Sequence, residues 1–127
     1  MTETAQVRIL KPTGDRPALP LVDGEGEATA IVWPGVGAHM RSIHRFVLAA
    51  GSRTVLQRHP GEAVYYLKDG SARVEDVDAN EQSDLRIGSM VHIEPETGYV
   101  FIAGDDGAEI VGGPCPADPA LYTHLTS

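Results

Sequence analysis

The sequence is poor in cysteine, in basic residues and in long apolar runs. Its single cysteine, Cys115, excludes an internal disulfide and a thiolate metal cluster, so a bound metal would need nitrogen and oxygen ligands. Ten Lys and Arg stand against eighteen Asp and Glu, and the formal charge of −8 repels phosphate backbones and anionic lipid surfaces. We therefore expect a small molecule as the partner, and neither nucleic acid nor a membrane.

Long apolar segments are also missing. The sequence has no run of about 18 apolar residues to span a bilayer. Its first residues, MTETAQVRILK, lack the basic-then-apolar order of a secretory signal. The sequence therefore predicts a cytoplasmic protein, and 127 residues with 42% apolar side chains are enough for one domain with one core.

Helical periodicity is scarce, and the strand signal takes its place. Fourteen glycines and nine prolines divide the chain into short pieces that are rich in β-branched, aromatic or alternating residues. Many short strands with close turns favour an antiparallel sandwich or barrel. A short terminal helix is predicted where Asp118 caps and Pro119 takes the first helical position. The predicted strands are 6–10, 27–33, 42–49, 53–58, 62–68, 71–77, 84–93, 99–103 and 108–112.

Two segments are predicted to connect these strands. Residues 11–27, rich in proline and glycine, are expected to form an arm over the surface or over a neighbouring subunit. Residues 75–84 contain five acidic residues and no basic one, which is typical of a solvated hairpin tip, with cation binding as the alternative.

Strand alternation predicts which side chains share the inner face. Neighbouring residues in a strand point to opposite sides of the sheet, so each charged residue marks the outer face and its neighbours lie inside. Arg58, for example, marks the outer face, so its neighbours Gln57 and His59 are both predicted to point inward. The predicted interior contains several polar groups among apolar ones, which is typical of a small-ligand pocket. The other inward residues are His44, Phe46, Leu48, Ala63, Tyr65, Leu67, Ala72 and Val74.

The stretch GSRTVLQRHPGEAVYYLKDG, residues 51–70, resembles the first motif of the cupins, G-x5-H-x-H-x3,4-E-x6-G. The marked positions are held, at the correct spacing, by Gly51, Gln57, His59, Ala63 and Gly70. The second cupin motif, G-x5-P-x-G-x2-H-x3-N, is less complete. It begins at Gly88, its histidine and asparagine positions hold Tyr99 and Ala103, and its proline and glycine are displaced to Pro95 and Gly98.

The resemblance covers about residues 42–112 and implies an all-β cupin-type double-stranded β-helix, a jelly-roll barrel, with a short C-terminal helix or tail. We expect an N-terminal strand and arm with the first barrel strands at 1–41, the barrel core with both motifs at 42–114 and a tail at 115–127, all in one domain. Because small cupins commonly exchange or pair N-terminal strands, the resemblance also implies a homodimer.

Cupin metal sites are built from three histidines and a glutamate, and His59 is the one ligand that this chain keeps. A divalent transition metal (Fe, Ni, Mn or Zn) held by His59, Gln57, Tyr99 and His44 stays open, although amides and phenols bind such metals less well than imidazole and carboxylate. Glu62 stands beside the lost glutamate position, but one step along a strand turns a side chain to the opposite face.

The same positions also suggest metal-free acid–base chemistry, as in the sugar-nucleotide epimerases among the cupins. His59 would act as the base and Tyr99 or Tyr65 as the acid, with Gln57, His44 and Tyr65 binding the substrate. The predicted function is isomerisation, cyclisation or dehydration of a small oxygen-rich molecule. A metal-dependent oxygenase or lyase and a non-catalytic binding or sensing domain remain the alternatives. For Tyr65, Tyr66 and Tyr99 the alternative is that they are barrel aromatics, which are common in strands.

Overall fold

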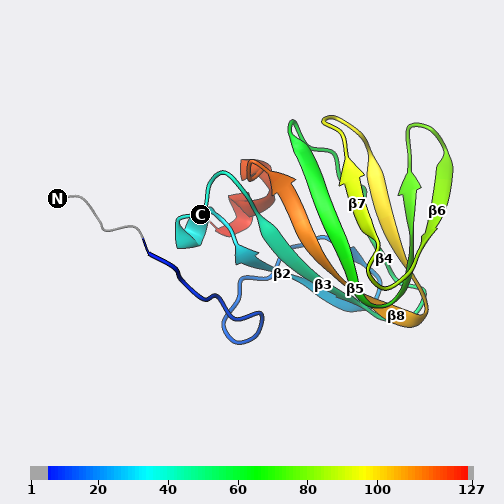
Figure 1. Ribbon diagram of the computed structural model, residues 1–127, viewed down its shortest axis with the longest axis horizontal. Coiled ribbons are helices and arrows are strands. Elements are labelled where there is room, and N and C mark those ends of the chain that lie inside the picture. Colours follow the sequence, from blue (N-terminus) through cyan, green and yellow to red (C-terminus); the bar gives the residue numbers. More distant parts are fainter. Residues whose placement is uncertain (1–5, 126–127) are drawn as a thin grey trace.

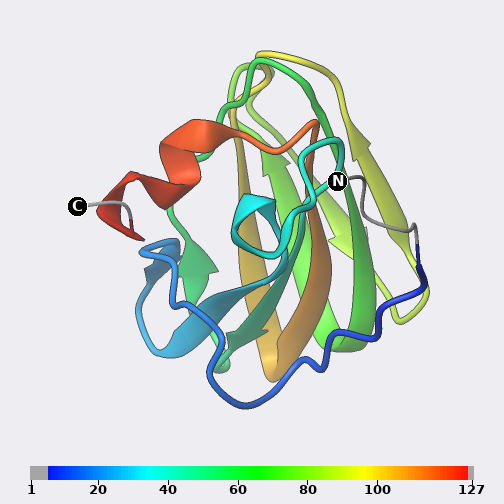
Figure 2. The same cartoon turned by 90° about the vertical axis from the view of Figure 1, so that its left-hand side faces the viewer.

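The computed structural model describes residues 6–125 and is built almost entirely from antiparallel strands (Figure 1). The sheet wraps around a buried core, and the C-terminal segment lies across one end of it (Figure 2). The elements in chain order are β1 (Val22–Asp23), β2 (Gly26–Val32), η1 (Pro34–Val36), β3 (Ile43–Leu48), β4 (Arg53–Thr54), β5 (Glu62–Asp76), β6 (Glu81–Leu85), β7 (Met90–Ile93), β8 (Tyr99–Cys115) and η2 (Pro119–Leu125), where η marks a 3-10 helix.

Two long strands, β5 and β8, hold the sheet together. They pair with each other over most of their length, and β8 also pairs with β3 and β4 while β5 also pairs with β6 and β7. The β5–β8 register shifts between Leu67 and Asp69 and again between Gly70 and Ala72. Such irregularities bend a strand. Each long strand can therefore pair with different neighbours along its two halves as the sheet curves. The predicted all-β barrel is confirmed.

Several strand boundaries differ from the prediction. The segments predicted at 62–68 and 71–77 are one strand, and so are those at 99–103 and 108–112. The strand predicted at 84–93 is two strands, because a turn with Gly88 at φ +95° separates β6 from β7. The strand predicted at 53–58 is short and is followed by an isolated bridge at Gln57.

The strand predicted at 6–10 is wrong for the described residues. Residues 6–10 have no strand conformation, and the side chains of Val7 and Ile9 are 93% and 87% exposed. An isolated apolar segment forms a strand only when it pairs with another one. The β-propensity of this segment alone was therefore a poor guide.

The predicted inner face is confirmed. His44, Phe46, Leu67 and Tyr65 are almost fully buried, while Arg58 and Lys68 on the outer face are exposed. The acidic segment 75–84 forms the end of the β5–β6 hairpin, as predicted. None of the helices in the described part of the chain has the length and hydropathy that a membrane span requires.

The predicted short C-terminal helix is confirmed as the 3-10 helix η2, which begins at Pro119. Asp118 precedes it, and its Oδ1 accepts a hydrogen bond from the backbone N–H of Ala120 at 3.1 Å. This side-chain cap satisfies a backbone donor that would otherwise lack a partner at the start of the helix.

Gly70→Ala is expected to destabilise the protein by about 2 kcal/mol or more, because Gly70 has φ +82° and an added Cβ would collide with the carbonyl oxygen of Gly107. Gly51→Ala is the matched control, since Gly51 has φ +77° but nothing within 4 Å of the added carbon. Its expected cost is the backbone strain alone, about 1 kcal/mol. Urea unfolding of both variants measures the difference, and equal costs would contradict the steric argument.

Candidate active site in the barrel interior

The two cupin-like segments meet inside the barrel at Gln57 and Tyr99. Their backbones exchange two hydrogen bonds, Gln57 N–H to Tyr99 O at 3.1 Å and Tyr99 N–H to Gln57 O at 3.0 Å. Residues paired in this way point to the same face. His59 lies two residues after Gln57 and therefore faces inward as well; all three side chains are buried.

A chain of hydrogen bonds connects four of the buried side chains. Asp118 Oδ2 lies 2.7 Å from His59 Nδ1, and His59 Nε2 lies 2.8 Å from the hydroxyl of Tyr99. The Tyr99 hydroxyl lies 2.5 Å from that of Tyr65. The members come from the C-terminal segment, from the loop before β5, and from strands β8 and β5, so only the folded barrel brings them together.

The carboxylate of Asp118 sets the direction of this chain. An ionised carboxylate can only accept a hydrogen bond, so His59 donates from Nδ1 and is left with Nε2 as an acceptor. Tyr99 then donates its hydroxyl proton to His59 Nε2, and Tyr65 donates to the oxygen of Tyr99. The contact with Asp118 thereby orients the ring of His59 so that Nε2 faces a phenol.

Burial keeps both phenols protonated. Loss of solvation raises the pKa of Tyr99, and the neighbouring Tyr65 raises it further. Burial likewise raises the pKa of Tyr65, although its hydrogen bond with Tyr99 acts in the opposite direction. Near neutral pH the two tyrosines are therefore protonated and act as hydrogen-bond donors. Each can give up its hydroxyl proton only if its oxygen takes up another proton at the same time.

His44 forms a separate pair with the C-terminal helix. Its Nε2 lies 2.6 Å from the hydroxyl of Tyr122, and its Nδ1 has no hydrogen-bond partner among the described residues. Burial, with a smaller contribution from the nearby His59, lowers the pKa of His44 to about 4. His44 is thus neutral at physiological pH and adds no charge to the interior.

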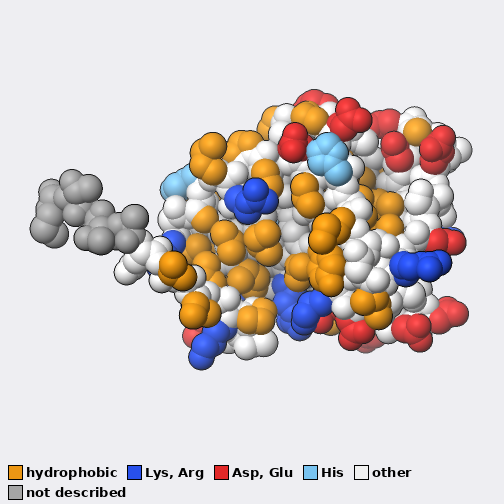
Figure 3. All heavy atoms as spheres, in the orientation of Figure 1, with side chains coloured by type: hydrophobic (Ala, Val, Ile, Leu, Met, Phe, Trp, Pro, Cys, Tyr) orange, Lys and Arg blue, Asp and Glu red, His pale blue; other side chains and the backbone are white. Residues whose placement is uncertain are grey.

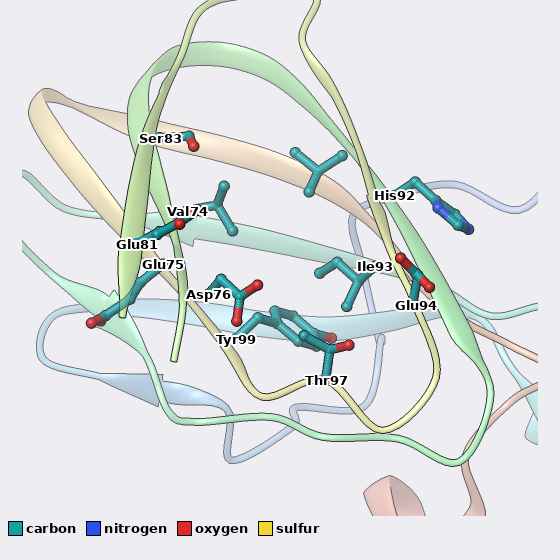
Figure 4. Close-up of a pocket in the computed structure, with 11 residues that line it drawn as sticks. Val74, Glu75, Asp76, Glu81, Ser83, His92, Ile93, Glu94, Thr97 and Tyr99 are labelled. Atoms are coloured by element: carbon teal, nitrogen blue, oxygen red, sulfur yellow. The ribbon is translucent and has the colours of Figure 1, made fainter. Parts of the chain in front are cut away.

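A pocket of about 250 Å³ opens at the end of the barrel formed by β5 to β8, and Tyr99 reaches it from the relay (Figure 4). Asp76 and Thr97 lie beside Tyr99 in this view. Val74 and Ile93 supply apolar surface. Such a pocket is large enough for a small molecule of several carbon and oxygen atoms.

Solved structures resemble this arrangement of strands. A cupin-like protein from Thermotoga maritima superposes with a TM-score of 0.69 and 18% sequence identity, over 95% of this chain and 84% of that chain. An RmlC-like cupin from Shewanella frigidimarina gives a TM-score of 0.64 with 14% identity, over 81% and 86% of the two chains. This chain has the cupin fold.

A third match with this fold is the polyketide cyclase RemF from Streptomyces resistomycificus. Its TM-score is 0.70 with 18% identity, over 87% of this chain and 80% of that chain. At the level of sequence, no protein-family model and no curated protein matches this chain. At such identities the likeness establishes the fold and leaves the chemistry to the residues of the site.

The residues at the usual cupin metal position do not fit a metal ion. Both ring nitrogens of His59 already have partners, the glutamate position holds Ala63, and Gln57 and Tyr99 offer neutral oxygen ligands. Among residues 6–125 there is no group of three or more His, Cys, Asp or Glu that could hold a metal. These residues therefore do not make up a ligand set for a divalent transition metal.

Most of the predicted site residues lie in the cupin barrel's interior, but they divide into two sets. His59, Tyr99 and Tyr65 belong to one relay, whereas His44 belongs to the pair with Tyr122. Gln57 is 4% exposed, and neither polar atom of its amide has a hydrogen-bond partner among the described residues. A buried amide without a protein partner is costly, so Gln57 is well suited to bind a substrate group.

The structure adds Asp118 and Tyr122, which the sequence did not assign to the site. Asp118 was predicted as a helix cap, and it is one, but its second oxygen also binds His59. No spacing in the sequence connects these residues, which are 59 positions apart. Glu62 instead faces outward, where its Oε1 lies 3.4 Å from Nε2 of His92, an exposed residue that lines the pocket but takes no part in the relay.

Proposed function

We propose that this protein is an enzyme that moves a proton within a small oxygen-rich molecule, in an isomerisation, cyclisation or dehydration. One observation carries the proposal: the chain Asp118, His59, Tyr99 and Tyr65 places a base and two phenols in series, and Tyr99 borders a pocket. An imidazole oriented by a carboxylate is suited to general acid–base catalysis.

The relay needs no outside reagent. A proton leaves the carbon next to a substrate carbonyl and bonds to the oxygen of Tyr99, while the hydroxyl proton of Tyr99 passes to His59 Nε2. The electron pair of the broken C–H bond forms an enolate, and His59 becomes an imidazolium stabilised by Asp118. Return of the proton to another atom of the substrate completes an isomerisation. Alternatively, attack of the enolate carbon on a second carbonyl of the substrate closes a ring, and the alkoxide that forms takes a proton from Tyr99 while His59 Nε2 returns its proton to Tyr99.

Gln57 and Tyr65 have supporting roles in this proposal. The amide of Gln57 donates to the substrate oxygen on which charge develops, and Tyr65 donates to the oxygen of Tyr99. The structural likeness to a polyketide cyclase supports ring closure as one member of the reaction class. His59 acts through Tyr99 because its Nε2 is hydrogen-bonded to the Tyr99 hydroxyl and because Tyr99, unlike His59, lines the pocket.

The proposal is tested with a panel of small carbonyl compounds in deuterated water, followed by NMR. The wild-type protein is expected to exchange the proton next to a carbonyl, or to isomerise the compound, for at least one member of the panel. Failure to act on any member would contradict the proposal. Metal supplementation of each sample serves as a check on the metal-dependent alternative.

Asp118→Asn is expected to lower that rate about 100-fold. The carbonyl oxygen of the introduced amide can still accept the Ala120 N–H, so the helix cap is preserved. The NH₂ group of the same amide donates to His59 Nδ1, however, and this moves the imidazole proton to Nε2. Nitrogen-15 chemical shifts of the His59 ring report this change of tautomer directly.

Asp78→Asn is the matched control, because Asp78 lies on the surface and pairs with Arg58. It is expected to leave both the rate and the His59 tautomer unchanged. An Asp118→Asn protein with the wild-type rate would remove Asp118 from the mechanism.

A further inference from the structure

A row of directly paired residues crosses the strands at the pocket. Gln57 pairs with Tyr99, Tyr99 pairs with Asp76 of β5, and Asp76 pairs with Glu81 of β6. Directly paired residues in antiparallel strands point to the same face of the sheet. The row therefore presents an amide, a phenol and two carboxylates, in that order, toward the interior and the pocket mouth.

The outer part of this row has an excess of negative charge. Glu75, Asp76, Glu81 and Glu94 line the pocket, and its lining residues include no Lys or Arg among those that the structure describes. Asp and Glu side chains also gather around the end of the molecule where β6 and β7 lie (Figure 3). The nearby Arg58 is committed elsewhere, since it donates two hydrogen bonds of 2.9 Å to Asp78.

The directly opposed carboxylates of Asp76 and Glu81 are expected to lower the stability of the protein without a ligand. Like charges directly opposite one another in a sheet are destabilising, and here no Lys or Arg of the described pocket lining offsets them. The carboxylate of Asp76 is also held in place, because its Oδ1 accepts the backbone N–H of Ala79 at 3.1 Å. A positively charged ligand would relieve this repulsion.

Gln57, at the inner end of the row, indicates a ligand independently of these carboxylates. Gln57 is 4% exposed, and both polar atoms of its amide lack a partner among the described residues. Its pairing with Tyr99 sets its side chain on the same face of the sheet as Tyr99, which lines the pocket, although Gln57 itself is not among the lining residues. A molecule that extends from Asp76 past Tyr99 would supply the group that this amide requires.

We propose that the substrate carries a positively charged amino group, which Asp76 and Glu81 bind, and an oxygen that reaches Gln57. This inference rests on the proposed function, because it places the reacting atoms at Tyr99 between the two ends. Anionic substrates such as carboxylates and phosphate esters are rejected by repulsion.

The test is a binding experiment with matched small molecules. Each scaffold is prepared as a primary amine, a neutral alcohol and a carboxylate, and binding is followed in proton–nitrogen NMR spectra of the whole protein. The amines are expected to shift the backbone signals of residues 74–76, 81–83 and 97, with an affinity at least about tenfold higher than that of the carboxylates. Equal binding of the two charge types, or no binding of any amine, would overturn the inference.

The double variant Asp76→Asn/Glu81→Gln removes both charges and keeps similar side-chain shapes, and the amide oxygen introduced at position 76 can still accept the Ala79 N–H. This variant is expected to lose the preference for amines. Asp105→Asn/Asp106→Asn is the control, since it removes two charges from residues that do not line this pocket. A preference that persists in the first variant, or disappears in the second, would also overturn the inference.

The two proposals can fail separately. If carbonyl compounds react without any preference for amines, the charge selectivity is wrong and the relay mechanism stands. If amines bind at the pocket with the stated preference but no compound is converted, the enzymatic proposal is wrong and the pocket belongs to a binding protein.

Discussion

Tyr99→Phe is expected to lower turnover by about 10³-fold while the protein stays folded. The substitution removes a single oxygen, but that oxygen is hydrogen-bonded to both His59 and Tyr65, and Tyr99 is the member of the relay that lines the pocket. Without it, no proton passes between the substrate and His59. The rate of deuterium exchange into the substrate measures the loss, and circular dichroism checks the fold.

Tyr66→Phe is the matched control for this substitution. Tyr66 is the neighbour of Tyr65 in β5 and is half-buried on the opposite face, so it takes no part in the relay. Its rate is expected to stay close to that of the wild type, because the removed hydroxyl has no contact with the relay residues. If Tyr99→Phe also kept the wild-type rate, the tyrosines would be barrel aromatics with a packing role alone.

Unfolding free energy is expected to fall by about 3 kcal/mol between pH 7 and pH 4 through His44 alone. Burial lowers the pKa of His44 in the folded protein to about 4, whereas the unfolded chain has the ordinary value of 6.5. Between these values the unfolded chain binds a proton and the folded protein does not. Acid therefore favours unfolding, and the stabilising effect of higher pH is complete above about pH 6.5.

Urea unfolding at pH 7 and at pH 4.5 measures this dependence. His44→Gln replaces the ring with an amide that can still bond to Tyr122 and does not titrate, so the loss of stability between the two pH values should shrink. His92→Gln is the control, because His92 is exposed and should leave the dependence unchanged. An unaltered slope in His44→Gln would show that other groups cause the acid sensitivity.

The inner and outer faces of the strands were predictable from local pattern. Arg58 and Lys68 marked the solvent side correctly, because a charged side chain is costly to bury and strand alternation then fixes its neighbours. The glycine spacing from Gly51 to Gly70 also indicated the barrel. Strand lengths were less predictable, since the bends in β5 depend on its pairing with β8.

The candidate site was predictable in membership and not in connectivity. Gln57, His59, Tyr65 and Tyr99 followed from strand alternation and from motif spacing, and all four are buried. Asp118 was outside the prediction of the site because its contact with His59 is made by a C-terminal segment that crosses the end of the barrel. Local sequence carries no signal for such a long-range contact.

The sequence by itself determined the all-β barrel, the inward residues and the loss of the usual cupin metal ligands, because strand period, turn residues and ligand spacing are local properties of the chain. The tertiary structure decided which inward residues act together. In the folded protein His59 is hydrogen-bonded to Asp118 and Tyr99, whereas His44 is hydrogen-bonded to Tyr122. Strand pairing also places four residues in one row, in the order Gln57, Tyr99, Asp76 and Glu81. These relations depend on the pairing of distant strands and on the docking of the C-terminal helix, which are fixed only when the whole core is packed.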